Sequence, residues 1–254
     1  MNSNWPQTLW IVRHGQSAGN VARDAAEAGG LPLIELAWRD IDVPLSELGI
    51  AQARALGDWF GKLPTDEKPE VILSSPYLRA RATAELVAEH GGMAGDMLKL
   101  RTDERLREKE FGILDRLTKL GIQQKHPDLN DQRQHVGKFY FRPPGGESWC
   151  DVILRLRSLL EMVTREYAGQ RVLVVGHQVI VNCLRYLLEH MDEQRILDID
   201  REGDVPNCAI TSYRAERREE DEVLQLDLVN FLAPLREAAT PVTRAPDQPA
   251  APKP

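Results

Sequence analysis

An arginine and a histidine stand side by side at the predicted end of a buried strand. Residues 9–12 are four consecutive apolar residues, a pattern typical of such a strand, and Arg13, His14 and Gly15 follow directly. In an open α/β sheet, the carboxyl ends of strands face the crevice in which ligands bind. A neutral imidazole is a nucleophile, and a neighbouring guanidinium attracts an anion. The pair therefore predicts an oxyanion site, with phosphate as the favoured ion and His14 as the attacking group.

Two further predicted strands end in groups that suit the same chemistry. Residues 71–75 lead into Pro76, with Arg79 one turn into the next predicted helix, and residues 171–176 lead into His177. Because the carboxyl ends of parallel strands meet at one edge of a sheet, we expect two histidines and two arginines to converge there. The helix near Pro76 would add the positive end of its dipole. Alone, His177 or Arg79 is more often a structural or surface residue, but their joint occurrence at strand ends favours a functional site.

The elements that must position these groups alternate between strands and helices. Helices are predicted at about 46–63, 76–90, 149–167 and 179–189, and further strands at 98–102, 209–213 and 223–230. This order predicts a three-layer α/β/α sandwich with a mainly parallel sheet, formed by one domain over residues 1–234. Insertions are expected at about 21–42, as a loop with one short helix, and at 113–147. The Pro- and Ala-rich residues 235–254 are predicted to form a disordered tail.

Composition restricts the partners of the chain. Its net charge is -7 over 254 residues, which disfavours nucleic acid and anionic membranes and leaves a small phosphorylated metabolite as the expected ligand. The three cysteines are far apart and odd in number, which favours a reducing, cytoplasmic location. Neither a signal peptide nor an apolar stretch long enough to cross a bilayer is evident. The oligomeric state cannot be read from the sequence.

Four separated motifs resemble those of the histidine phosphatase superfamily, the family of phosphoglycerate mutase and fructose-2,6-bisphosphatase. The motifs are Arg13-His14-Gly15 with Asn20, Ser74-Ser75-Pro76-x-x-Arg79-Ala80, Leu106-x-Glu108-x-x-x-Gly112 and Gly176-His177. The pattern Pro44-Leu45-Ser46-x-x-Gly49-x-x-Gln52-Ala53 also matches the family's first helix. The resemblance spans about residues 8–190 and implies the phosphoglycerate mutase-like fold.

The resemblance also implies a role for each matching residue. His14 would attack phosphorus and become a phosphohistidine, and Glu108 would protonate the leaving oxygen and later activate water. The groups implied to hold the phosphoryl oxygens are Arg13, Arg79 and His177, together with Asn20. Glu104 and Glu110 compete for the role of the acid, and the four-residue step from Glu108 to Gly112 favours Glu108. No cofactor is implied.

The segment after the acid points to one branch of the family. Gln178 follows His177, and the stretch Tyr140-Phe141-Arg142-Pro143-x-Gly145-x-Glu147-Ser148 also resembles the bisphosphatase branch. We therefore expect Gln178, Tyr140 and Arg142 on the substrate side of the pocket. The alternative for 139–142 is a segment that packs the cap, with Arg142 at the surface. The interval of 177 − 108 = 69 residues is short for a mutase, which favours a phosphatase.

Other chemistries are disfavoured. Cys208 and Arg214 have the Cys-x5-Arg spacing of cysteine phosphatases, but the loop between them has no glycine and alternates like a strand. Two histidines and a glutamate could bind zinc, but the arginines beside them would oppose a cation. Two alternatives stay open: a cofactor-dependent phosphoglycerate mutase, and a regulatory protein that binds phosphate with little turnover.

Overall fold

A computed structural model describes residues 5–93, 98–218 and 221–244, which contain one six-stranded sheet. Its strands are β1 (Thr8–Arg13), β2 (Val71–Ser74), β3 (Lys99–Thr102), β4 (Arg171–Gly176), β5 (Ile210–Arg218) and β6 (Asp221–Phe231). They lie in the order β3-β2-β4-β1-β5-β6. The first four strands are parallel to one another, β5 pairs antiparallel with β1, and β6 pairs antiparallel with β5. The predicted α/β fold with a mainly parallel sheet is confirmed.

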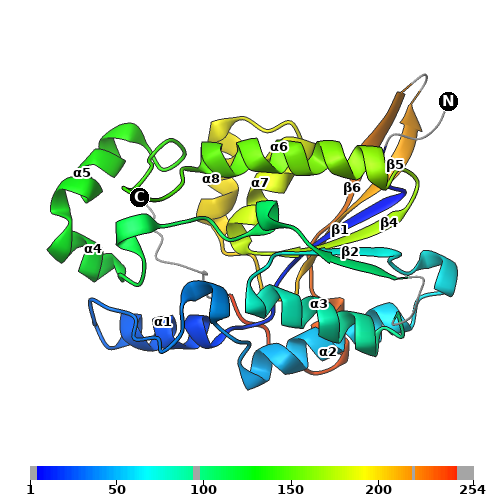
Figure 1. Ribbon diagram of the computed structural model, residues 1–254, viewed down its shortest axis with the longest axis horizontal. Coiled ribbons are helices and arrows are strands. Elements are labelled where there is room, and N and C mark those ends of the chain that lie inside the picture. Colours follow the sequence, from blue (N-terminus) through cyan, green and yellow to red (C-terminus); the bar gives the residue numbers. More distant parts are fainter. Residues whose placement is uncertain (1–4, 94–97, 219–220, 245–254) are drawn as a thin grey trace.

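Helices cover both faces of this sheet (Figure 1). They are α1 (Ala18–Ala28), α2 (Glu47–Gly61), α3 (Leu78–His90), α4 (Lys119–Lys125), α5 (Pro127–Val136), α6 (Trp149–Glu166), α7 (Gln178–Leu188), α8 (Glu193–Glu202) and α9 (Ala233–Glu237). Helices α6 and α7 lie on one face, and α2 and α3 on the other, while α4 and α5 extend beyond the end of the sheet. In the part of the chain described, none of these helices has the length and apolar character needed to cross a membrane.

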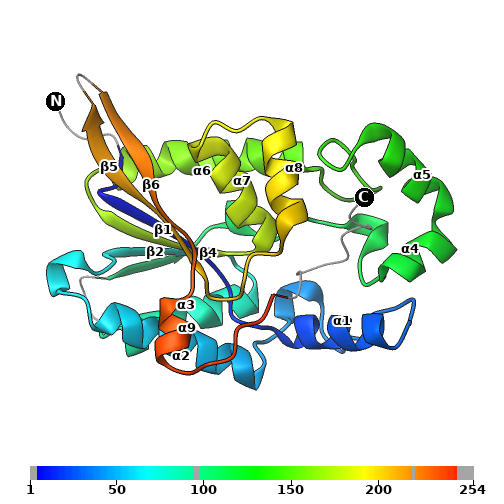
Figure 2. The ribbon, with the colours of Figure 1, turned by 180° about the vertical axis from the view of Figure 1, so that it is seen from behind.

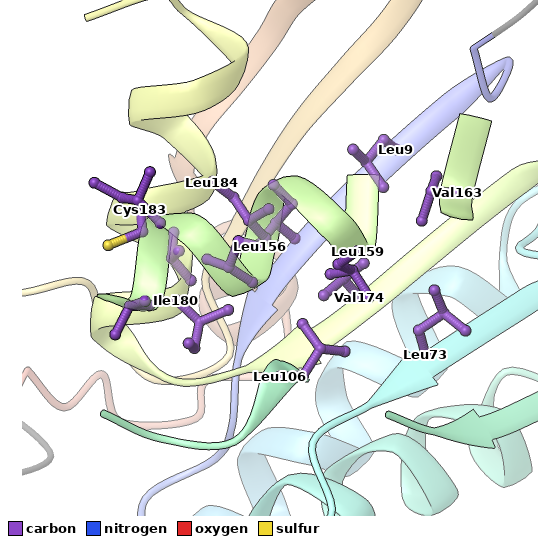
Figure 3. Close-up of a cluster of buried hydrophobic side chains, with 14 of the residues drawn as sticks. Leu9, Leu73, Leu106, Leu156, Leu159, Val163, Val174, Ile180, Cys183 and Leu184 are labelled. Atoms are coloured by element: carbon purple, nitrogen blue, oxygen red, sulfur yellow. The ribbon is translucent and has the colours of Figure 1, made fainter. Parts of the chain in front are cut away.

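Alternate side chains of the strands contribute to two apolar cores, one on each face of the sheet. Leu9 and Ile11 of β1 pack with residues of α6 and α7 (Figure 3), whereas Trp10 and Val12 pack with residues of α2 and α3. Successive side chains of a strand point to opposite faces, so an uninterrupted apolar strand serves both layers. Because β1 is packed on both faces, the position of its carboxyl end is fixed, and so is that of the residues that follow it.

Two of the expected local structures need correction. Helix α1 begins at Ala18, before the predicted loop, because Ser17 and Asn20 form a capping box at its first turn. Residues 235–244, expected in a disordered tail, are ordered: Leu235 is fully buried and Thr243 is hydrogen-bonded to the domain. The apolar residues within this Pro- and Ala-rich stretch supply the anchor that composition alone did not reveal. The rest of the tail, 245–254, and the turn at 219–220 lie outside the described residues.

Candidate active site

His14 is held at the carboxyl end of β1 by backbone contacts. Its N–H donates to the carbonyl oxygen of Gly176 in the neighbouring strand at 2.9 Å, and its side chain is fully buried. The ring Nδ1 lies 2.6 Å from the carbonyl oxygen of Gly15, which can accept only if Nδ1 carries the proton. This contact favours the tautomer in which the lone pair is on Nε2. A Cβ at Gly15 would lie 2.5 Å from the carbonyl oxygen of Gly49, so the turn after His14 requires glycine.

His177 occupies the equivalent place after β4, which pairs in parallel with β1. The two imidazole rings are 5.1 Å apart between centroids and inclined at 66°, so both lie on the same side of the sheet edge. His177 Nε2 is 2.8 Å from the hydroxyl oxygen of Ser75, which follows β2. Three strand ends therefore meet at one place, as the sequence led us to expect.

The two arginines predicted to bind the anion are also buried. Arg13 Nη1 donates to the carbonyl oxygen of Val205 at 2.6 Å. Arg79 Nη1, in the first turn of α3, donates to the carbonyl and carboxylate oxygens of Asp40 at 2.7 and 3.0 Å. Asp40 belongs to the 21–42 insertion, so this insertion reaches the edge of the site. The Arg79 guanidinium also lies 5.0 Å from the centre of the Tyr77 ring, which is itself 5.2 Å from the ring of His177, so a paired cation stands close to the histidines.

Glu108 approaches from a segment without helix or strand. Its side chain is 1% exposed, Oε1 accepts from the backbone N–H of Lys109 at 2.8 Å, and Oε2 lies 3.5 Å from His177 Nδ1. A carboxyl group in this place can exchange a proton with a group bound between the histidines. The structure thus brings His14, His177 and Glu108 together from three separate parts of the chain.

Glu147, in the motif noted after the acid, holds the segment that carries Glu108. Its carboxylate accepts two hydrogen bonds from Arg155 of α6, at 2.9 and 3.0 Å, and one from Arg107 at 2.7 Å. It also accepts from the backbone N–H of Glu110 at 3.1 Å, while Arg155 donates to the carbonyl oxygen of Glu108 at 3.2 Å. Burial raises the pKa of Glu147, but the hydrogen bonds and charges of the arginines outweigh it and leave the pKa lowered. Glu147 is therefore a charged link between α6 and the acid's segment.

Two predicted contact residues have partners of their own in the structure. Asn20 is 1% exposed, and its Oδ1 accepts from the backbone N–H and the hydroxyl of Ser17 at 2.9 and 3.0 Å. Of the asparagine side chain, only the amide N–H groups can donate to an anion, because the oxygen can only accept. Gln178 directly follows His177 and donates from Nε2 to Asp204 at 2.7 Å. Phosphate contacts by Asn20 and Gln178 stay predictions.

The structure does not bring Tyr140 and Arg142 to the histidines. Arg142 is 62% exposed in its side chain and pairs with Asp151 in the first turn of α6. Tyr140 is 54% exposed and stacks edge-on against Phe139. Phe139 and Phe141 of this segment are buried in apolar clusters, whereas Tyr140 and Arg142 lie at the surface. That Tyr140 and Arg142 line the substrate side of the pocket stays a prediction.

Some residues close to the site were not predicted. The ring of Tyr77 lies 5.2 Å from that of His177, and its hydroxyl donates to Glu110 at 3.0 Å. Burial raises the pKa of Tyr77, so it stays a neutral donor. Lys109, next to the acid, is 7% exposed with Nζ 4.2 Å from the centre of the Phe111 ring. Position alone could have indicated both, because one follows the Ser-Ser-Pro motif and the other follows Glu108.

The disfavoured chemistries gain no support. Burial raises the pKa of the Cys208 thiol, and Cys208 is fully buried just before β5, an environment unsuited to a thiolate nucleophile. In the described part of the chain, no three His, Cys, Asp or Glu side chains gather in a group that could hold a metal ion.

Comparison with known proteins places this geometry in a family. The chain is 31% identical over 205 residues to a 2,3-bisphosphoglycerate-dependent phosphoglycerate mutase of Methylobacterium radiotolerans, covering 78% of this chain and 86% of that protein. A second such mutase, from Gloeobacter violaceus, is 32% identical over 200 residues, covering 78% and 83%. Among solved structures, a mycobacterial glucosyl-3-phosphoglycerate phosphatase in complex with VO3 is similar. Its TM-score is 0.65 at 28% identity, covering 89% of this chain and 99% of that one.

The model of the histidine phosphatase superfamily (branch 1) matches residues 9–227, a range that includes all the residues brought together here. The chain therefore belongs to the histidine phosphatase superfamily.

Proposed function

We propose that this chain is a phosphatase that hydrolyses a phosphomonoester through a phosphohistidine on His14. One observation carries the proposal: the His14 ring is buried beside His177, with Nδ1 against a carbonyl oxygen, and Glu108 Oε2 lies 3.5 Å from His177 Nδ1. Such a tautomer gives Nε2 the electron pair that attacks phosphorus. The similar mycobacterial phosphatase is in complex with the oxyanion VO3, which is of the same size class as a phosphoryl group.

In the first step, His14 Nε2 forms a bond to phosphorus while the bond to the ester oxygen breaks. Glu108 gives its proton to that oxygen, so the product leaves as an alcohol. Arg13, Arg79 and His177 bind the equatorial oxygens and stabilise their charge in the transition state, with Asn20 and Gln178 as further donors.

In the second step, water attacks the phosphorus of the phosphohistidine. The Glu108 carboxylate takes a proton from this water, the bond from nitrogen to phosphorus breaks, and inorganic phosphate leaves. His14 and Glu108 return to their starting forms, so one turnover consumes one ester and one water. Water is the default acceptor at this stage unless the enzyme excludes it.

The ligand that we propose is a small phosphorylated metabolite in the cytoplasm. A chain of net charge -7 with a buried basic site attracts small anions rather than nucleic acid or anionic membranes. All three cysteines are free thiols, which fits a reducing compartment.

A phosphoglycerate mutase is the second candidate, because the curated relatives described above carry that name. The two functions differ in what accepts the phosphoryl group: water in a phosphatase, and a second hydroxyl of a phosphoglycerate in a mutase. Incubation with 3-phosphoglycerate, with and without 2,3-bisphosphoglycerate, separates them. We expect free phosphate, and 2-phosphoglycerate as the main product would contradict the phosphatase proposal.

A phosphate-binding regulatory protein with little turnover is the remaining alternative. Hydrolysis of p-nitrophenyl phosphate by the wild type, lost in His14→Ala, supports an enzyme. Trapping of an acid-labile, base-stable phosphoryl group on His14 identifies the intermediate directly. Equal inactivity of the two proteins on a broad panel of phosphate esters would favour the regulatory protein.

A further inference from the structure

The chain beyond the family match folds back onto the nucleophile's turn. The match ends at residue 227, and α9 then packs on α2, with Leu235 fully buried in the core that contains Leu56 and Phe60. Figure 2 shows the following segment (red) leaving α9 and running past α2 toward α1. Residues 241–243, here called the C-terminal strap, therefore reach the region of His14 from the side of α2.

Thr243 contacts two fully buried amide side chains. Its hydroxyl donates to Oδ1 of Asn207 at 2.8 Å and accepts from Nε2 of Gln52 at 3.0 Å. Its carbonyl oxygen accepts from the backbone N–H of Asn207 at 3.0 Å, and the carbonyl oxygen of Pro241 accepts from Gln52 Nε2 at 2.9 Å. A buried amide that loses its partners costs free energy, so the strap and these two residues stabilise one another.

The same two amides hold the backbone of the nucleophile's turn. Nδ2 of Asn207 donates to the carbonyl oxygen of His14 at 2.8 Å, and Oε1 of Gln52 accepts from the N–H of Gln16 at 2.9 Å. An amide has donors at one end and an acceptor at the other, so partners at both ends decide which way it points. The Thr243 hydroxyl fixes Asn207 with its donor toward His14, and the strap fixes Gln52 with its acceptor toward Gln16.

We propose that the C-terminal strap is a positioning element for His14 that acts through Asn207 and Gln52, an inference that rests on the proposed phosphohistidine chemistry. The contacts of the strap described above are with Gln52 and Asn207, the supports of the turn. The strap should therefore affect the rate of attack on phosphorus more than the binding of the phosphoryl group. A reacting atom displaced by about 1 Å can lower a rate by about 10²-fold, which bounds the expected effect.

Two truncations that differ by four residues test the strap. A chain ending at Arg244 keeps every contact described above, and a chain ending at Thr240 loses the strap but keeps α9. We expect the first to match the full chain. The second should lose about tenfold or more in kcat, with little change in KM, on both p-nitrophenyl phosphate and an alkyl phosphate. The fall in kcat should be similar for the two substrates because His14 attacks the phosphorus of each.

A pair of point variants tests the hydroxyl itself. Thr243→Val removes the hydroxyl with little change of shape, and Thr243→Ser keeps it. We expect Thr243→Val to lower kcat and Thr243→Ser to retain it, with similar melting temperatures for the two variants. This pair decides the question even if the chain ending at Thr240 does not fold.

A double variant tests the route through Asn207. If the strap acts through it, Thr243→Val should cost little more kcat in an Asn207→Ala background than Asn207→Ala alone. If the losses in kcat from Thr243→Val and Asn207→Ala are independent and additive, the route through Asn207 is wrong. If Thr243→Val and Thr243→Ser have equal kcat values, the proposed role of the strap is wrong. Absence of phosphate release and of a phosphohistidine in the full chain instead overturns the proposed function, and it is seen before any variant is made.

Discussion

The nucleophile and the acid are held in place by two different kinds of structure. His14 and His177 follow adjacent parallel strands, in a register that pairs Arg13 with Gly176, so the backbone of the sheet sets their separation. Glu108 lies on an irregular segment, fixed by side chains from elsewhere in the chain.

The apolar cluster that buries one face of β1 also supports the segment that carries the acid. Leu106, two residues before the acid, is fully buried among Leu156 and Leu159 of α6 (Figure 3). The charged link of Glu147 and Arg155 then fixes the polar part of the segment on the same helix. A strand end is rigid because its ladder continues into the sheet, whereas the acid's segment depends on a few removable contacts. The acid should therefore be the more easily displaced of the two groups.

The largest expected effect is the loss of the nucleophile. His14→Ala should lower kcat by about 10⁴-fold or more on every substrate, because no other group can form the intermediate. His14→Gln, which retains a polar side chain, should be as inactive. Steady-state assays with phosphoryl trapping check both variants, and a trapped phosphoryl group in either would place the intermediate on another residue.

Loss of the acid should be smaller and should depend on the substrate. Glu108→Gln should lower kcat/KM for an alkyl phosphate by about 10²- to 10⁴-fold, the usual contribution of general acid catalysis. It should change kcat/KM for p-nitrophenyl phosphate far less, because p-nitrophenolate leaves without a proton. Equal losses on the two substrates would assign the proton to another group, with Glu110 and Glu104 the next to test.

Weakening the contacts that hold the acid's segment should also lower kcat/KM for the alkyl phosphate more than for p-nitrophenyl phosphate, but by a smaller factor. Glu147→Gln keeps the shape of the side chain but weakens its bonds to Arg155 and Arg107. We expect kcat/KM for the alkyl phosphate to fall by about 10- to 10²-fold, with p-nitrophenyl phosphate again little affected. In a Glu108→Gln background, the same change should add almost nothing.

The matched control is a half-buried carboxylate just after α7. Glu189 accepts from Arg185 at 2.8 and 3.2 Å and is 18% exposed, against 12% for Glu147, but it lies outside the acid's segment. Glu189→Gln should affect stability without changing the ratio of the two substrates. A changed ratio there would mean that any buried ion pair produces the effect.

The smallest effect concerns stability and not the rate. Burial lowers the pKa of Lys109 from 10.5 to about 8, although Glu108 and Glu147 oppose the shift. Below pH 8 the folded chain carries this buried charge at a cost of up to about 3 kcal/mol, and the cost disappears as pH rises from 8 to 10.5, where only the unfolded chain still holds the proton. Lys109→Met should therefore raise the free energy of unfolding most below pH 8.

Denaturant unfolding of this variant at several pH values measures the difference. The gain over the wild type should shrink between pH 8 and 10.5. Lys125→Met, at an exposed position of α4, should show no such pH dependence. A gain that is the same at every pH would mean that Lys109 is not buried as a charge.

The positions of the strand ends follow from the sequence alone. Short apolar runs followed by Arg13-His14, Ser74-Ser75 and Gly176-His177 were sufficient to predict a parallel sheet and one shared edge, because strand periodicity and strand ends are local properties. Serine is a favoured residue at helix N-termini, and Ser46 and Ser148 each accept from a backbone N–H of the helix that follows.

Features that depend on contacts between distant residues emerge only in the folded chain. Tyr140 and Arg142 matched a family pattern, yet the fold buries Phe139 and Phe141 beside them and leaves both at the surface, with Arg142 paired to Asp151. The composition of residues 235–244 predicted disorder, yet the burial of Leu235 and the hydrogen bonds of Thr243 to Gln52 and Asn207 hold them against the domain. The burial of a single side chain, and the partner that it finds across the fold, are set by packing and not by local pattern.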